Sequence, residues 1–204
     1  MTTLADLRPG DIMFARHVRP LAADLLILMG QTILGQPGYP HHVGVVTAQS
    51  SRTAEAFGPK VVEAMPNGAR EVEIGAERWT ADYIYVRPAY EAVPNAFPLD
   101  ICGERVAYEA QKYIGTPYSF ADYLALAVHK VSGEGYAMIE KRNALQRYVS
   151  NSKRMICSQL ADQAMSDAGF HVFDDGRLPQ DVTPGALYEK LLDLPGTTTL
   201  HPRR

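Results

Sequence analysis

Cysteine is scarce in this sequence, with two residues among 204. Two cysteines cannot build the disulfide framework of a small secreted domain, so a reduced compartment is the default expectation. An excess of one charge is also lacking, because 20 basic and 23 acidic side chains leave a formal net charge of −3. Lysine and arginine form no dense cluster, and we therefore expect no nucleic-acid partner.

Long hydrophobic runs are absent as well. The most apolar stretch, residues 21–34, is interrupted by Asp24, Gly30 and Gln31. It is too short and too polar to span a bilayer, so we expect no stable membrane insertion. We interpret it as a buried or groove-lining helix, and a helix that touches a membrane surface is the alternative.

The first residues of the chain lack the charged-then-apolar order of a signal peptide. This pattern predicts a cytoplasmic protein, or one that is exported by a non-classical route. A phage particle or an injected effector would be such a route.

The composition is that of an ordinary globular protein, with 46% hydrophobic and 21% charged residues. A chain of this length is expected to form one domain, residues 1–204, with a loose tail at 195–204. Short apolar or alternating runs predict strands at residues 12–15, 43–46, 60–64, 69–74 and 83–86. Helical spacing predicts helices at residues 21–34, 99–113, 120–131, 137–149, 157–168 and 183–192. Strands followed by helices indicate an α+β fold.

Cys157 occupies a position that favours reactivity. Ile156, Leu160 and Ala164 recur at helical spacing, which places Cys157 in the first turn of a helix. Unsatisfied backbone N–H groups and the positive end of the helix dipole favour the thiolate there, and the thiolate is the nucleophile. A small buried thiol that only packs is the simpler interpretation, unless the chain also supplies a base and an orienting group.

Two further segments offer such groups. His41 and His42 stand at the mouth of an apolar strand, and we select His42, which directly precedes the apolar run, over His41. Glu63 lies within an apolar strand, where a carboxylate is costly unless it is paired. Alone, each histidine would be a polar strand end and Glu63 an edge residue that faces water. With Cys157 they make a set of nucleophile, base and orienter.

Five short motifs follow one another in a defined order. They are Pro9-Gly10-Asp11-Ile12, His42-Val43-Gly44-Val45-Val46, Val62-Glu63-Ala64, Gly115-Thr116-Pro117-Tyr118 and Ile156-Cys157-Ser158. This order resembles the circularly permuted branch of the NlpC/P60 superfamily, papain-like cysteine hydrolases in which the histidine strand precedes the cysteine helix. The resemblance covers about residues 7–168.

The resemblance implies a papain-like fold, in which a small antiparallel sheet or barrel packs against helices and the nucleophile begins a helix. It implies Cys157 as nucleophile, His42 as general base, Glu63 as orienter and Tyr118 as a residue that lines the site. His41 and Ser158, beside the base and the nucleophile, join Tyr118 as candidates for substrate binding. Residues 133–151 are long for the family pattern and are a candidate lid or recognition insert.

The implied activity is hydrolysis of an amide bond through an acyl-enzyme, with a small peptide or cell-wall fragment as substrate. Acyl-ester or thioester chemistry on lipids is the alternative, because lecithin:retinol acyltransferase-like proteins share the permuted order. A non-catalytic binding module is a third interpretation. An open polar groove beside the nucleophile would favour a peptide, and a deep apolar tunnel an acyl chain. No metal or other cofactor is expected, and the oligomeric state is left open.

The second cysteine serves as a comparison. Cys102 shares a helical stripe with Val106 and Ala110, and no motif surrounds it. We predict that Cys102 only packs and that Cys157 reacts much faster with an alkylating agent.

Overall fold

The computed structural model describes residues 3–17, 32, 40–49, 58–74, 81–90, 99–118, 155–177, 179 and 182–201. The helices predicted at 120–131 and 137–149 and the candidate insert at 133–151 lie outside the described residues. The helix predicted at 21–34 also lies outside them, apart from Thr32. No helix in the described part of the chain is long and apolar enough to cross a membrane.

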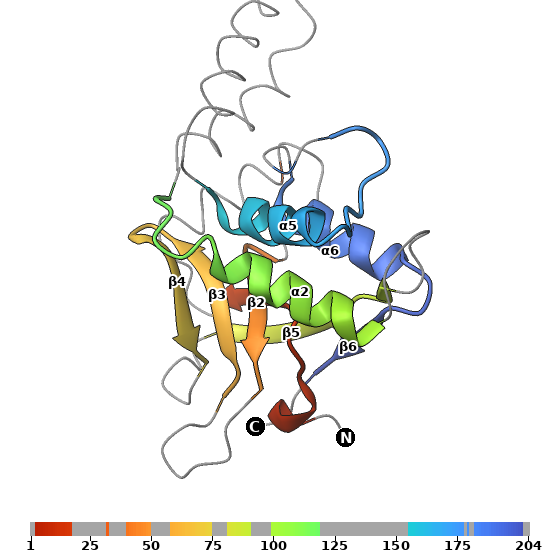
Figure 1. Cartoon of the computed structure of the whole chain (residues 1–204), viewed down its shortest axis with the longest axis horizontal. Helices are drawn as coiled ribbons and strands as arrows, with labels where there is room; N and C mark the ends of the chain where they lie inside the picture. Colours follow the sequence, from red (N-terminus) through yellow and green to blue (C-terminus); the bar gives the residue numbers. More distant parts are fainter. Residues whose placement is uncertain are drawn as a thin grey trace, which may run out of the picture.

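Six strands form one open antiparallel sheet in the order β4-β3-β2-β1-β5-β6 (Figure 1). Their bounds are β1 Ile12–His17, β2 His42–Ala48, β3 Lys60–Met65, β4 Gly68–Glu73, β5 Ala81–Arg87 and β6 Thr198–Leu200. The five runs predicted as strands are therefore confirmed, with ends that differ from the predicted ones by at most two residues.

The sixth strand was not expected from the sequence. The prediction of a loose tail at 195–204 is wrong for residues 198–200, because β6 pairs with β5 through Tyr85 opposite Leu200 and Arg87 opposite Thr198. The Leu200 side chain is buried. A strand of three residues is too short to show an alternating pattern, although threonine is favoured in strands.

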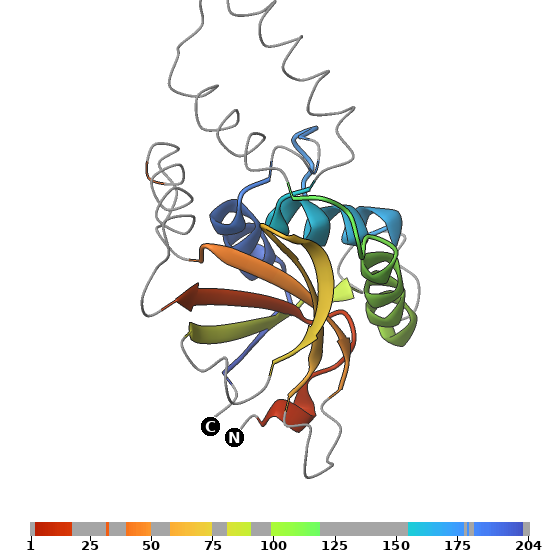
Figure 2. The same ribbon diagram turned by 90° about the vertical axis from the view of Figure 1, so that its left-hand side faces the viewer.

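Within the described residues, three α helices pack against the sheet, which makes the fold α+β. They are α2 Leu99–Gln111, α5 Cys157–Asp167 and α6 Pro184–Asp193, preceded in the chain by the short 3-10 helix η1 Leu4–Asp6. The helices lie together on one side of the sheet (Figures 1 and 2). The bounds of α5 and α6 agree with the predicted ranges 157–168 and 183–192 to within one residue. Gly169, with φ +86°, follows α5, and the Thr183 hydroxyl accepts a hydrogen bond from the Ala186 N–H at the start of α6.

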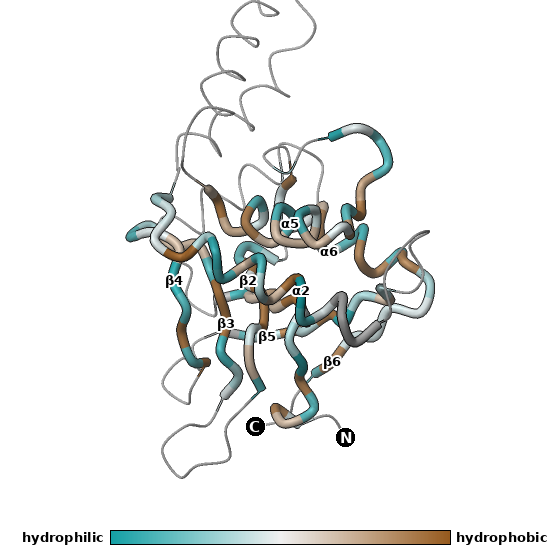
Figure 3. Tube along the Cα trace, in the orientation of Figure 1, coloured by the Kyte–Doolittle hydropathy of each residue, from teal (hydrophilic) through white to brown (hydrophobic). Residues whose placement is uncertain are grey.

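The hydrophobic core occupies both faces of the sheet. Apolar residues recur along β3 and β5 and on α2 (Figure 3). On the helix side, Val43, Val45 and Val62 pack with Leu160 and Leu187, and a second cluster on the other side is formed by Leu7, Met13, Val46, Val61, Ile74, Tyr85 and Leu200. Burial on both faces explains why β2 reads as an almost continuous apolar run.

The motif at residues 9–12 is explained by packing. Gly10 has φ +87°, and an added Cβ would lie 2.4 Å from the Cα of Gly103 on α2. Asp11 is buried and accepts hydrogen bonds from the Arg87 Nε and Nη2 atoms, both at 2.7 Å. The turn before β1 is therefore fixed against α2 and β5, which anchors the central strand of the sheet.

Candidate active site

Cys157 is the first residue of α5, and its position is fixed by a segment from far earlier in the chain. The Met155 N–H donates to the Pro117 carbonyl at 2.9 Å, and Tyr118 forms a parallel bridge with Met155. The same segment is bound to β4, since the Gly115 N–H donates to the Ala69 carbonyl at 2.8 Å. The start of α5 is thereby linked to the sheet, with Cys157 only 1% exposed.

His42 and Glu63 meet across two neighbouring strands. Gly44 on β2 is the register partner of Glu63 on β3, and His42 lies two residues before Gly44 on the same face. The His42 Nε2 atom lies 2.8 Å from Glu63 Oε2. Both side chains are buried, and a buried carboxylate that is paired avoids most of its desolvation penalty.

The Cys157 side chain also acts on the His42 ring and favours its charged form. Because Nε2 faces Glu63, Nδ1 is the ring nitrogen left for the sulfur. Burial lowers the pKa of His42, but the hydrogen bonds with Cys157 and Glu63 outweigh it and raise this pKa from 6.5 to about 10. The imidazolium form is therefore favoured between a sulfur and a carboxylate. The structure brings the three predicted residues together, and it places His42 in the position between the two others.

A fourth side chain, Arg70, completes this arrangement and was not found from the sequence. It is the register partner of Glu63 on β4, and its Nε and Nη2 atoms lie 3.2 and 3.0 Å from Glu63 Oε1. The sequence held a signal for it. A two-residue turn, Pro66-Asn67, joins β3 to β4, and counting back from it places Glu63 opposite Arg70.

The other candidates are placed as follows. Tyr118 is half-buried and packs against Ile156, directly beside Cys157. Ser158 is fully buried and donates its hydroxyl to the Val182 carbonyl at 2.7 Å, so it would contact a substrate only by giving up that bond. His41 is fully buried just before β2. The roles of all three in substrate binding stay predictions.

The side chain of Cys102 lies outside the described residues. Its backbone belongs to α2, as predicted. Val106 and Ala110, which share its helical stripe, are fully buried.

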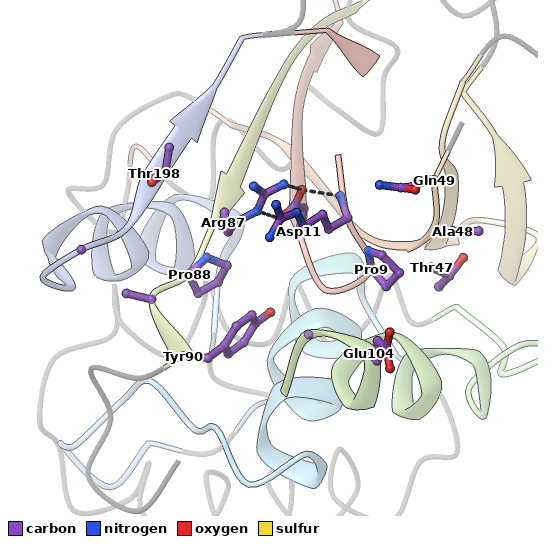
Figure 4. A pocket seen from close by; sticks show the side chains of 14 residues that line it. Pro9, Asp11, Thr47, Ala48, Gln49, Arg87, Pro88, Tyr90, Glu104 and Thr198 are labelled. Atoms are coloured by element: carbon purple, nitrogen blue, oxygen red, sulfur yellow. Dashed lines mark hydrogen bonds and ion pairs between the residues drawn. The ribbon is translucent and has the colours of Figure 1, made fainter. Parts of the chain in front are cut away.

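A separate pocket of about 650 Å³ lies at the far end of β2 from His42 (Figure 4). Among its lining residues are Thr47 and Gln49 at the end of β2, Arg87 at the end of β5, and Tyr90. The described residues that line it include neither a cysteine nor a histidine, and the charge of Arg87 is balanced by Asp11. This described lining thus lacks the nucleophile and base that the site around Cys157 has.

No metal site is evident within the described ranges, where no group of three or more histidine, cysteine, aspartate or glutamate side chains is placed to hold an ion. No family model matches the chain, and no curated protein matches it. The geometry of the site therefore carries the functional argument.

Proposed function

We propose that this protein is a cysteine hydrolase that cleaves an amide bond through Cys157, His42 and Glu63. The supporting observation is the set itself: His42 Nε2 lies 2.8 Å from Glu63 Oε2, and Cys157 and Glu63 together raise the pKa of His42. These residues come from a helix start and two strands that are far apart in the sequence. Nucleophile, base and orienter in mutual contact are the arrangement that nucleophilic catalysis requires.

Each residue has a defined part in the proposed reaction. The Cys157 thiolate attacks the carbonyl carbon of the amide and forms a C–S bond. As the C–N bond breaks, the His42 imidazolium donates its proton to the leaving amine, which leaves an acyl-enzyme thioester. His42 then accepts a proton from water, the resulting hydroxide attacks the thioester, and the C–S bond breaks to release the acid. Glu63 holds the imidazole ring and stabilises its charged form throughout.

The proposal extends to family and substrate. A histidine strand that precedes the cysteine helix, with that helix packed on an antiparallel sheet, supports membership of the permuted NlpC/P60 branch and a papain-like fold. A peptide of the peptidoglycan type is the substrate that this resemblance implies. The alternative, acyl transfer or hydrolysis on lipids, uses the same thiolate and is separated from it by the substrate that acylates Cys157.

Mass spectrometry of the intact protein tests the proposal. The protein is incubated with muropeptides and, separately, with phospholipids, and the mass added to Cys157 is measured. We expect a peptide-derived acyl adduct that is absent in Cys157→Ala and retained in Cys102→Ala, the matched control. A fatty-acyl adduct would favour acyl chemistry on lipids over amide cleavage. Turnover by Cys157→Ala would overturn both hypotheses.

Substitutions of the three proposed catalytic residues should lower the activity by different amounts. Cys157→Ala should unfold at nearly the wild-type denaturant concentration, with a loss of about 1 kcal/mol, because the change is small and alanine suits a first helical turn. Its activity should fall by orders of magnitude, since no acyl-enzyme can form. His42→Ala should cost nearly as much, and Glu63→Gln less, because glutamine keeps a hydrogen bond to the ring.

A further inference from the structure

The carboxylate of Glu63 is bound at both oxygen atoms. Oε2 meets the His42 ring at 2.8 Å, and Oε1 lies 3.0 Å from Arg70 Nη2 and 3.2 Å from Arg70 Nε. A carboxylate bonded through one oxygen can rotate about its last side-chain bond. Bonds on both sides restrict that rotation and so fix the direction in which Oε2 points.

The two ends of the Glu63–Arg70 pair differ in their surroundings. The Glu63 side chain is 1% exposed, whereas that of Arg70 is 36% exposed. A buried carboxylate tends to take up a proton, and a nearby arginine opposes this because its charge is permanent. Arg70 therefore supplies the positive charge that keeps Glu63 ionised, while it remains partly in water and keeps much of its own hydration.

A chain of polar contacts thus runs across four elements, from Arg70 on β4 through Glu63 on β3 and His42 on β2 to Cys157 on α5. The first link is set by strand register, because Arg70 and Glu63 are direct partners. We propose that Arg70 is a positioning residue, which holds Glu63 ionised and aimed at His42 and thereby sustains the reactive thiolate of Cys157. This inference rests on the proposed function.

Removal of Arg70 should lower the reactivity of Cys157 at acidic pH. Without the guanidinium, Glu63 protonates more readily as the pH falls, and a neutral Glu63 stabilises the imidazolium less. A weaker imidazolium supports the reaction of Cys157 less, so the reactivity of Cys157 should fall in mildly acidic buffer.

The test measures alkylation of Cys157 by iodoacetamide across the pH range in wild type, Arg70→Gln and Arg70→Lys, followed by peptide mass spectrometry. It needs no substrate. We expect Arg70→Gln to react about tenfold more slowly in mildly acidic buffer, the effect of moving that side of the profile by about one pH unit. Arg70→Lys should recover part of the rate, since it keeps the charge but loses the second N–H donor to Oε1.

Lys60→Gln is the matched control. Lys60 is on the same hairpin, and its ammonium lies 3.8 Å from Glu71 rather than near Glu63. The Lys60→Gln variant removes one positive charge from the β3–β4 hairpin without changing Arg70, Glu63, His42 or Cys157. Its pH profile of alkylation should therefore match that of wild type. Equal profiles for Arg70→Gln and wild type, or equal losses in Arg70→Gln and Lys60→Gln, would overturn the inference.

The outcomes separate this inference from the proposed function. A wild-type Cys157 that reacts no faster than Cys102 would overturn the proposed function. A reactive wild-type thiol whose profile is unchanged in Arg70→Gln would overturn only the role of Arg70. If Arg70→Gln does not fold, as judged by circular dichroism, the pH profile of Arg70→Lys decides. A profile like that of wild type would refute the positioning of Glu63 by the two N–H donors of Arg70. A shift of the profile toward higher pH would support it. When a substrate is in hand, Arg70→Gln should lower kcat with little change in KM, since Arg70 acts through Glu63 and not on the substrate.

Discussion

Replacing Glu63 by glutamine should lower the pKa of His42 by an amount that can be bounded from the structure. In the wild type, burial opposes the charged ring, and yet the hydrogen bonds with Cys157 and Glu63 raise this pKa from 6.5 to about 10. The net rise corresponds to about 5 kcal/mol in favour of the imidazolium. Since one neighbouring charge changes a pKa by about 1 to 3, His42 in Glu63→Gln should titrate between about 7 and 9.

The assay is an NMR titration of the His42 ring in wild type, Glu63→Gln, Cys157→Ala and the double variant, with His42→Gln to assign the signal. Glu63→Gln removes the charge of one partner but keeps its hydrogen bond, Cys157→Ala removes the other partner, and the double variant combines both changes. Burial then outweighs the one neutral hydrogen bond that remains, so the pKa of His42 in the double variant should fall below 6.5. A wild-type titration in Glu63→Gln, or a value above 6.5 in the double variant, would refute the argument.

The same shift makes the stability of the protein depend on pH. The pKa of His42 is raised in the folded state, so the folded state holds its proton more tightly than the unfolded chain does. The resulting stabilisation is complete below about pH 6.5 and is lost as the pH rises through about 10. The melting temperature of wild type should therefore fall over this window, and that of Glu63→Gln should fall less.

Two further predictions concern stability away from Cys157, and equilibrium unfolding in urea measures both. Gly103→Ala would place a Cβ 2.6 Å from the Pro9 carbonyl oxygen. The packing cost of about 1–3 kcal/mol should exceed the gain of about 1 kcal/mol from helix propensity, so the free energy of unfolding should fall. A higher free energy of unfolding would contradict this, and Glu104→Ala, at an exposed position of the same helix, is the control. Burial raises the pKa of Asp162 from 3.8 to about 6, although His171 opposes the rise, so wild type should lose stability as the pH rises from 3.8 to about 6. Asp162→Asn should remove that slope, and an unchanged slope would show that Asp162 is not its source.

The sequence was informative where one element carried the signal by itself. The apolar run after His42 predicts β2, and helical spacing from Ile156 predicts α5, because burial of one face leaves a period in the residues. The candidates Cys157, His42 and Glu63 were found because each stands at an element end or among apolar neighbours. β6 was missed because Thr198–Leu200 is stabilised by pairing with β5, which no local pattern records.

Two other features that depend on contacts between elements were not predicted. The hydrogen bond that commits Ser158 to the Val182 carbonyl depends on how the chain before α6 packs on α5. Arg70 looks like an ordinary polar strand residue until it is paired with Glu63. The residue type of Ser158 and its neighbours in sequence are uninformative. For Arg70, the turn at Pro66-Asn67 gives the register that places it opposite Glu63, but the residue type alone does not reveal the role.

The precision of the site follows from strand register. A slip of β3 by one residue against β2 would move Glu63 to the other face of the sheet and away from His42. Position 44, opposite Glu63, has no room for a larger side chain, because a Cβ added to Gly44 would lie 2.5 Å from Val61 Cγ1. Such a site on paired strands is held more rigidly than one on loops.

Solvent reaches the members of this site unequally. Cys157, His42 and Glu63 are 1%, 7% and 1% exposed, whereas the side chain of Arg70 is 36% exposed. Salt screens exposed charges far more than buried ones. Ionic strength should therefore act on the buried residues chiefly through Arg70, and the salt dependence of Cys157 alkylation should be smaller in Arg70→Gln than in wild type. An equal salt dependence in the two proteins would mean that the buried charges respond to solvent by another route.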